Sequence, residues 1–187
     1  MTTLPEKPLP VETVSAAALA PFGWLLGKAV STADAAADTA LAFTSPATDF
    51  WHEHGFDTGP GGETDILWVV YRSTDRTITE CEKHSLTQQA VIPLTGAIIQ
   101  ILALPAADGA PDMTSARAFV IPVGTGICMR PGIWHTTRVP VESADCLMLS
   151  RRSTTADLVR HLNTGTPAQE TQISAIPAHV LSFPKPK

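Results

Sequence analysis

Apolar residues in this chain occur in short runs that end at prolines or glycines, a pattern typical of β-strands joined by turns. Residues 66–71 (ILWVVY) form a continuous apolar run, which predicts a buried strand. Residues 77–84 alternate between apolar and polar positions, which predicts a half-buried strand. The same reasoning predicts six further short strands, over residues 89–94, 97–104, 118–123, 126–130, 135–141 and 146–150. Many short strands at even spacing favour an antiparallel β-sandwich or β-barrel.

Few segments have the pattern of a helix. Residues 15–20 (SAAALA) predict a short helix that ends at Pro21. Residues 155–162 predict one good helix, with Ser153 or Thr154 as its N-cap and Gly165 just beyond its end.

The ends of the chain and one internal segment fit neither pattern clearly. Residues 1–12 are rich in proline and polar residues, which predicts an extended N-terminal arm. Residues 32–39 are small and polar, as in a loop or a short helix, and the tail holds two short apolar runs, 172–176 and 179–183. We find no fixed-period repeat and no linker, so we expect a single domain over residues 1–187.

Composition narrows the fold class. The chain has 16 prolines among 187 residues, whereas proline makes up about 5% of an average protein. Proline breaks helix interiors, so this content excludes a helical bundle. Four prolines fall at predicted strand ends, where a missing N–H costs least: Pro93, Pro122, Pro131 and Pro140. Hydrophobic residues reach 44%, which is enough for a core. We therefore expect an all-β domain with a few short helices.

Charge and cysteine content exclude several classes of partner. The net charge is −5 and basic residues do not cluster, so nucleic acids and anionic membranes are poor partners. No apolar run approaches the ~20 residues of a membrane span. The N-terminal apolar stretch lacks a basic leader and is interrupted by prolines, so we interpret it as mature protein. The cysteines form no C-x-x-C pair, which predicts a reducing, cytoplasmic location; they are Cys81, Cys128 and Cys146.

One predicted strand carries several ionisable residues on one side. In residues 77–84, strand alternation places Glu80, Glu82 and His84 on one face, together with Ile78. Charged groups survive burial only when they are paired, hydrogen-bonded or bound to metal. The face is therefore either a functional site or simply exposed to solvent.

A second histidine-bearing strand follows a Pro-Gly turn. Here Trp134 lies on one face, and His135 and Val139 lie on the other. A single histidine is more often structural than a ligand. Two histidine-bearing strands next to turns in one small β-rich domain favour a shared site.

These residues resemble a broad superfamily and, more closely, one family within it. The spacing Glu82-x-His84, then Gln89 and Gly96, resembles a degenerate first cupin motif, with Glu82 and Gln89 in place of its first His and its Glu. The later Pro131-Gly132 and His135 resemble the second cupin motif. More closely, E-x-E-K-H-S-L-T-Q-Q-A-V-I-P-L, then R-A-F-V, then G-I-x-x-x-x-G-I-W-H is similar to the bacterial ureidoglycolate lyase family. The similarity is good from about residue 78 to residue 151.

The resemblance implies a cupin (RmlC-like) antiparallel β-barrel, or jelly roll, that is commonly dimeric. It implies cleavage of a C–N bond in ureidoglycolate to give glyoxylate and urea, a step of purine and allantoin nitrogen catabolism. The resemblance further implies one divalent transition metal, held by His84, His135, Glu82 and Gln89. It implies no organic cofactor. The acid–base candidates are His84, His135, Glu80 and Glu82. Arg130 and Gln89 are expected to bind the small carboxylic acid substrate.

Several positions depart from the family pattern and leave alternatives open. The resemblance implies an Asn-Tyr-His-like run where this chain has Cys128, Met129 and Arg130. It also implies a His where this chain has Thr136 and an Asp where it has Ser150. These changes favour a related enzyme with another small hydroxy or ureido acid as an alternative. A non-catalytic cupin that binds a small acid is the other.

Other candidates have simpler interpretations. We interpret Cys128 as a small apolar filler, and Trp24, Trp51 and Trp68 as core or dimer-interface aromatics. The cluster Trp51-His52-Glu53-His54 is interpreted as a loop between turn formers, with a lid over the barrel mouth as the alternative.

Overall fold

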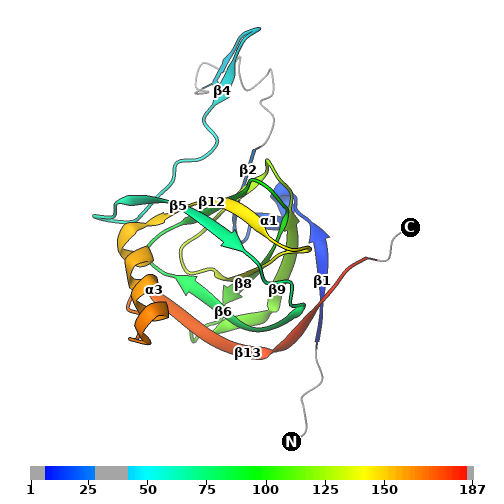
Figure 1. Ribbon diagram of the computed structural model, residues 1–187, viewed down its shortest axis with the longest axis vertical. Helices are drawn as coiled ribbons and strands as arrows, with labels where there is room; N and C mark the ends of the chain where they lie inside the picture. Colours follow the sequence, from blue (N-terminus) through cyan, green and yellow to red (C-terminus); the bar gives the residue numbers. More distant parts are fainter. Residues whose placement is uncertain (1–6, 28–41, 185–187) are drawn as a thin grey trace, which may run out of the picture.

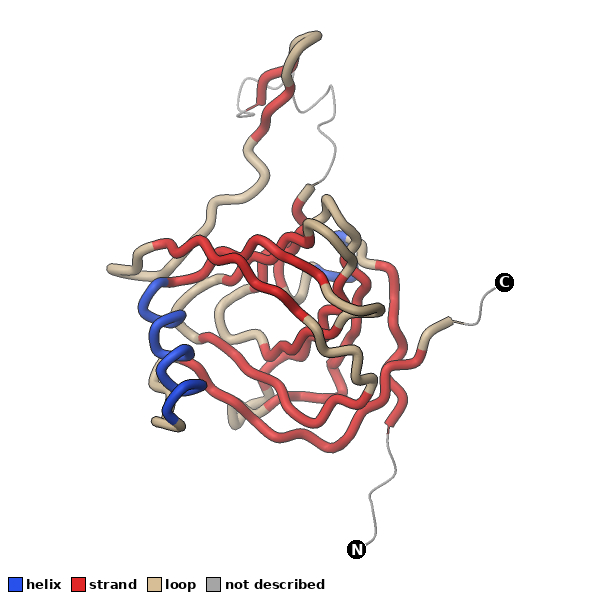
Figure 2. The backbone as a smooth tube through the Cα atoms, viewed as in Figure 1, coloured by secondary structure: helices blue, strands red, loops and turns tan. Residues whose placement is uncertain are grey.

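The computed structural model describes residues 7–27 and 42–184. Strands make up most of this part of the chain, and a single long helix lies beside them (Figure 2). The predicted all-β class is therefore confirmed.

Six strands close into a barrel in the spatial order β1-β13-β6-β11-β8-β9. Neighbours are antiparallel, except that β1 pairs in parallel with both β13 and β9 and so closes the barrel (Figure 1). Their bounds are β1 Lys7–Thr13, β6 Thr77–His84, β8 Ile98–Pro105, β9 Pro111–Ile121, β11 Trp134–Arg138 and β13 Thr171–Ser182.

The predicted N-terminal arm is wrong for its described part. Residues 7–13 are a barrel strand, and Leu9 and Val11 are buried in the barrel. Pairing on both sides satisfies backbone groups that an extended arm would leave to water.

A second, antiparallel sheet has the order β2-β10-β7-β12-β5. Its strands are β2 Gly23–Leu26, β5 Thr64–Tyr71, β7 Gln89–Pro93, β10 Gly126–Met129 and β12 Ala144–Arg151. A separate hairpin of β3 (Ala42–Thr44) and β4 (Asp49–Trp51) projects away from both sheets (Figure 1).

The barrel wall separates two cores. One is inside the barrel and is formed by Leu9, Val11, Ile78, Ile99, Ile101, Ala118 and Leu181. The other lies between the barrel and the second sheet, where Leu102 and Phe119 of the barrel pack against Val91 and Ile127 of the sheet. The barrel strands that face the second sheet therefore have two buried faces, and a polar residue on either face needs a partner.

The prediction of a buried strand at residues 66–71 is wrong. These residues belong to β5, which is the edge strand of the second sheet. Ile66 and Trp68 are each 70% exposed, because β5 turns only one face towards the core. The apolar run could not distinguish an edge strand from a central one.

Both predicted helices are present, but the N-cap of the longer one is not as predicted. Helix α1 (Ala16–Leu19) begins where the Ser15 hydroxyl accepts a hydrogen bond from the Ala18 N–H. Helix α3 (Arg152–Thr164) begins before Ser153 and Thr154, whose hydroxyls instead donate to the Glu170 carboxylate. Gly165 ends the helix in the left-handed conformation, as predicted.

The two short apolar runs of the C-terminal tail belong to one strand, β13, apart from Phe183. β13 pairs with β6 at residues 171–175 and 179–180, and its register shifts between Ala175 and His179, on either side of Pro177. The proline therefore sits at an irregularity, where a missing N–H is tolerated. The predicted loop or helix at residues 32–39 lies outside the described residues. No helix in the described part of the chain is long and apolar enough to cross a membrane.

We predict that Gly23→Ala destabilises the fold. An added Cβ would lie 2.0 Å from the backbone oxygen of Cys128, on the neighbouring strand β10. Such overpacking costs about 2 kcal/mol of unfolding free energy. Urea denaturation measures it, with Gly55→Ala as the control, because there the nearest atom is 3.9 Å away. Equal stability of the two variants would contradict the close packing of β2 on β10.

Candidate metal centre and active site

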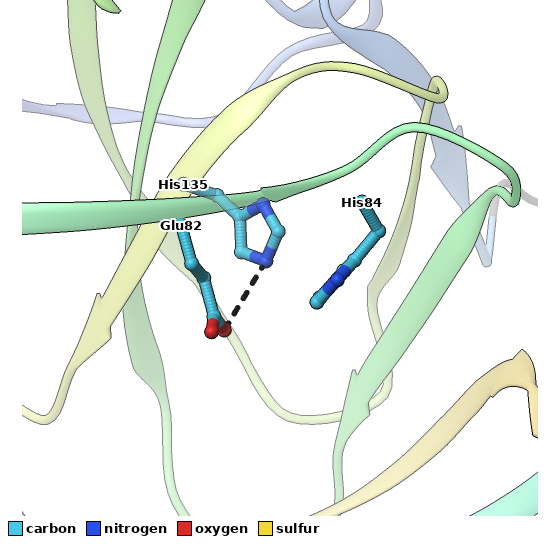
Figure 3. A group of neighbouring side chains, drawn as sticks. All are labelled: Glu82, His84 and His135. Atoms are coloured by element: carbon cyan, nitrogen blue, oxygen red, sulfur yellow. Dashed lines mark ion pairs between the residues drawn. The ribbon is translucent and has the colours of Figure 1, made fainter. Parts of the chain in front are cut away.

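Two barrel strands bring three ionisable side chains together. Glu82 and His84 come from β6, and His135 comes from β11, where it pairs directly with Glu82. One ligand atom from each residue lies within 4.8 Å of the other two. All three side chains point into the same space (Figure 3).

The local geometry of β6 agrees with the predicted face, except at one residue. Glu80, Glu82 and His84 pair with alternate residues of β13, so they share a face. Exposure falls along this face, since Glu80 is exposed, Glu82 is 33% exposed and His84 is 4% exposed. Ile78 was predicted on this face, but it packs inside the barrel, opposite the irregular stretch of β13 between Ala175 and His179.

The ring of His135 is held by the backbone. Its Nδ1 lies 3.0 Å from the carbonyl oxygen of Ile133. A carbonyl only accepts, so Nδ1 carries the proton and donates it. This leaves Nε2 available as a ligand, 3.5 Å from Oε1 of Glu82 (Figure 3).

The ring of His84 is held by a hydroxyl. Its Nδ1 is 3.1 Å from Oγ1 of Thr171, the residue opposite it on β13. The centroids of the two imidazoles are 5.2 Å apart. The Thr171 hydroxyl can accept from Nδ1, and in that tautomer the lone pair of His84 is on Nε2.

Both Nε2 atoms are buried and have no hydrogen-bond partner among the described residues. A buried polar atom without a partner costs about 1–3 kcal/mol, so such atoms are rare without a functional reason. The two Nε2 atoms and the neighbouring carboxylate offer two imidazole nitrogens and one oxygen, a set of ligands that suits a divalent transition metal. The residues therefore fit a metal ion, and several transition metals suit this set.

The charges of the site support this interpretation. Burial, with a contribution from the neighbouring His135, lowers the pKa of His84 to about 4, although Glu82 acts in the opposite direction. At neutral pH His84 is thus uncharged and able to coordinate. Burial alone would raise the pKa of Glu82, but its close contact with His135 and the charge interactions with both imidazoles outweigh this and lower it. Glu82 is thus ionised at neutral pH.

The two predicted substrate-binding residues lie beside this group. Gln89 and Arg130 line a narrow gap with both histidines and Met129. The guanidinium of Arg130, however, lies 4.0 Å from the ring centroid of Trp24 and donates to the carbonyl oxygen of Ala20. Gln89 as a metal ligand and Arg130 as a carboxylate anchor stay predictions.

The remaining candidates lie on another face of the second sheet. Cys128 is buried, and burial raises the pKa of its thiol to about 12, which agrees with a packing role. His54 stacks on Trp24 with ring centroids 4.2 Å apart, and its Nε2 is 3.0 Å from Oε1 of Gln88. Glu53 accepts from the indole of Trp51. The contacts of His54 hold the end of the Trp51-His52-Glu53-His54 segment against the second sheet.

Sequence reasoning missed the groups that orient the two histidines. Thr171 lies in the tail, 87 residues from His84. The other group is the carbonyl of Ile133, which has no side-chain signature. Only strand pairing brings Thr171 to His84, so spacing along the chain gave no signal for it.

Comparisons with known proteins agree on one family. A family model described as ureidoglycolate lyase matches residues 6–169. A protein named ureidoglycolate lyase from Pseudomonas fluorescens (strain SBW25) is 33% identical over 99 residues, which cover 51% of this chain and 59% of that protein. The match to a protein of the same name from Pseudomonas syringae pv. syringae covers 45% of it. Ureidoglycolate lyase 2 from Rhizobium meliloti (strain 1021) is 26% identical over 161 residues, 82% of this chain and 92% of that protein.

Solved structures give a weaker similarity. RmlC from Streptococcus suis in complex with dTDP-D-xylose has a TM-score of 0.41 and 10% identity, over 59% of this chain and 60% of that one. A 3,4-ketoisomerase from Helicobacter canadensis has a TM-score of 0.38 and 15% identity, over 67% of this chain and 96% of that one.

We predict that acid destabilises the metal-free protein through His84. The unfolded chain takes up a proton at this histidine near pH 6.5, whereas the folded chain does so only near pH 4. Unfolding thus binds a proton between these values, and the folded state loses up to about 1.4 kcal/mol per pH unit as the pH falls from 6.5 towards 4. The lowered pKa of Glu82 adds a loss only below pH 4.5, the ordinary pKa of a glutamate.

Denaturation in urea from pH 7 to pH 5, after treatment with a chelator, measures this effect. His84→Gln should flatten the pH dependence, and the matched change at the exposed His52 should leave it unaltered. A pH dependence that is the same in His84→Gln as in wild type would contradict a buried, neutral His84.

Proposed function

The chain belongs to the ureidoglycolate lyase family, and we propose that it cleaves ureidoglycolate to glyoxylate and urea. The observation that supports this most directly is the Glu82, His84 and His135 group with its two buried, unpartnered Nε2 atoms. The group combines an ionised, partly exposed carboxylate with two buried and oriented imidazoles.

The reaction requires the transfer of one proton within the substrate. The hydroxyl proton leaves, the C–O bond becomes the aldehyde of glyoxylate, and the C–N bond breaks. The departing nitrogen takes up a proton and becomes urea, so atoms and charge balance. A base near the hydroxyl and an acid near the nitrogen are sufficient for this elimination.

Glu82 is the best placed base among the described residues. It is ionised at neutral pH, and a third of its side chain is exposed, so substrate can reach it from solvent. Glu80 lies two residues away on the same face and is exposed, which makes it the second candidate. The acid must then be a group that exchanges protons with solvent, because the Nε2 atoms of both imidazoles are assigned to the metal.

His84, His135 and Glu82 would hold a divalent metal ion, with Gln89 as a further candidate ligand. When bound, the ion would polarise the hydroxyl and carboxylate oxygens of the substrate. The protein's own contribution is to fix both imidazoles through their Nδ1 atoms. The proposed cytoplasmic location is supported by the three cysteines, which are free and buried. The homodimer and the role in purine nitrogen catabolism stay predictions.

We predict that purified protein supplied with divalent metal releases glyoxylate from ureidoglycolate, followed spectroscopically. Glu82→Gln should lower kcat/KM about 100-fold, because a general base contributes on this scale. Glu80→Gln, the matched change on the same face, should retain activity within about tenfold. His84→Ala and His135→Ala should lower activity as much as Glu82→Gln.

An absence of glyoxylate above background with metal present would contradict ureidoglycolate as the substrate. The departures Met129 and Arg130 beside the histidines favour testing other small hydroxy and ureido acids in the same assay. Turnover of one of these acids alone would assign the site to a related reaction.

We predict that Thr171→Val weakens binding of a divalent metal about 10- to 100-fold. Loss of the group that hydrogen-bonds the other nitrogen of a ligating histidine typically lowers metal affinity by this factor. The variant removes the oxygen that holds Nδ1 of His84 and keeps the shape of the side chain. Thr171→Ser restores the hydroxyl and should restore affinity. Competition with a fluorescent chelator measures both, and equal affinity of Thr171→Val and wild type would overturn the role of this hydroxyl.

A further inference from the structure

A buried lysine lies between the two members of the metal group on β6. Lys83 alternates with Glu82 and His84, so its side chain points to the opposite face of the strand. It is only 8% exposed. Its Nζ donates to the carbonyl oxygen of Gly109 at 2.8 Å and lies 4.6 Å from the ring centroid of Trp134.

No carboxylate forms an ion pair with Lys83 within residues 7–27 and 42–184. Burying an ammonium without a counter-charge is costly. One of its three N–H donors is used by Gly109, and the face of Trp134 gives a further, weaker attraction. Two donors remain for another partner.

The lysine opens onto a cavity of about 620 Å³. Ligand sites commonly measure about 300–1,000 Å³. Its walls combine Lys83 and Trp134 with small and apolar residues, among them Ala110, Ala168 and Ile173. The indole N–H of Trp134 donates to the same Gly109 oxygen, which fixes the wall around the ammonium.

Two other titratable groups line this cavity. Asp108 is exposed, and its Oδ1 accepts from the Ala110 N–H. His161 lies within hydrogen-bonding distance of the Thr166 carbonyl through Nδ1. Lys83 is therefore the one buried charge among these groups, and within the described residues no carboxylate oxygen forms an ion pair with it.

We propose that this cavity binds a small carboxylate at Lys83, separately from the metal group. A carboxylate matches the two unused donors of the ammonium, and its short carbon chain can lie against Trp134 and the small apolar walls. The two sites are on opposite faces of β6. They adjoin through Thr171, which lines the cavity and also contacts His84. Binding here is independent of whether the protein is a lyase.

Isothermal titration of chelator-treated protein with acetate, glycolate and inorganic phosphate, at constant ionic strength, tests this proposal. Removal of metal prevents anions from binding through a bound ion. We expect saturable binding of at least one carboxylate. Lys83→Met should weaken it about tenfold or more, whereas the same substitution at the exposed Lys7 should leave it unchanged.

Two further variants keep the test decisive. Asp108→Asn removes a negative charge that would repel a carboxylate in the cavity, so it should tighten carboxylate binding. This variant tests the proposal even if Lys83→Met fails to fold. His135→Ala should not alter it, since His135 faces the metal group. The proposal is wrong if Lys83→Met binds as well as wild type, if Asp108→Asn does not bind more tightly, if His135→Ala abolishes binding, or if only phosphate binds.

Discussion

The closed barrel places strand β6 between β13 and β11, and this pairing is the constraint on which the rest of the site depends. One face of β6 looks towards the second sheet and the other towards the inside of the barrel. Glu82, Lys83 and His84 are consecutive, so ionisable side chains are buried or half-buried on both faces. Each face must supply a partner for these groups, because unpaired charge is unstable in a protein interior.

On the face towards the second sheet, only some of these polar atoms have partners. Backbone and hydroxyl groups satisfy both Nδ1 atoms, while both Nε2 atoms converge beside the Glu82 carboxylate. Fixing one nitrogen and leaving the other free orients an imidazole as a ligand. The stability lost at these buried atoms is thus explained if they serve a metal and the chemistry around it. On the opposite face, the carbonyl of Gly109 and the ring of Trp134 hold Lys83 without neutralising it.

Local patterns in the sequence predicted the fold class, the shared face of Glu80, Glu82 and His84, and the opposite faces of Trp134 and His135. Strand alternation is a local property, so it could be read directly from these residues. The pairing of strands that are distant in the sequence could not be predicted in this way. The apolar run of β5 gave no sign that it forms a sheet edge, and the proline-rich N-terminus gave none that it closes the barrel. Thr171 reaches His84 only because β13 pairs with β6. The resemblance to the family identified the histidines as a set, and the structure added the groups that orient them.

The central claim is that Glu82, His84 and His135 form one metal centre. X-ray absorption spectroscopy of protein purified without chelator, together with its metal content, tests this claim most directly. The account predicts about one transition metal per chain, with two imidazole nitrogens and at least one oxygen as ligands. Protein that binds no metal at this level, or a metal whose spectrum lacks imidazole ligands, would contradict it.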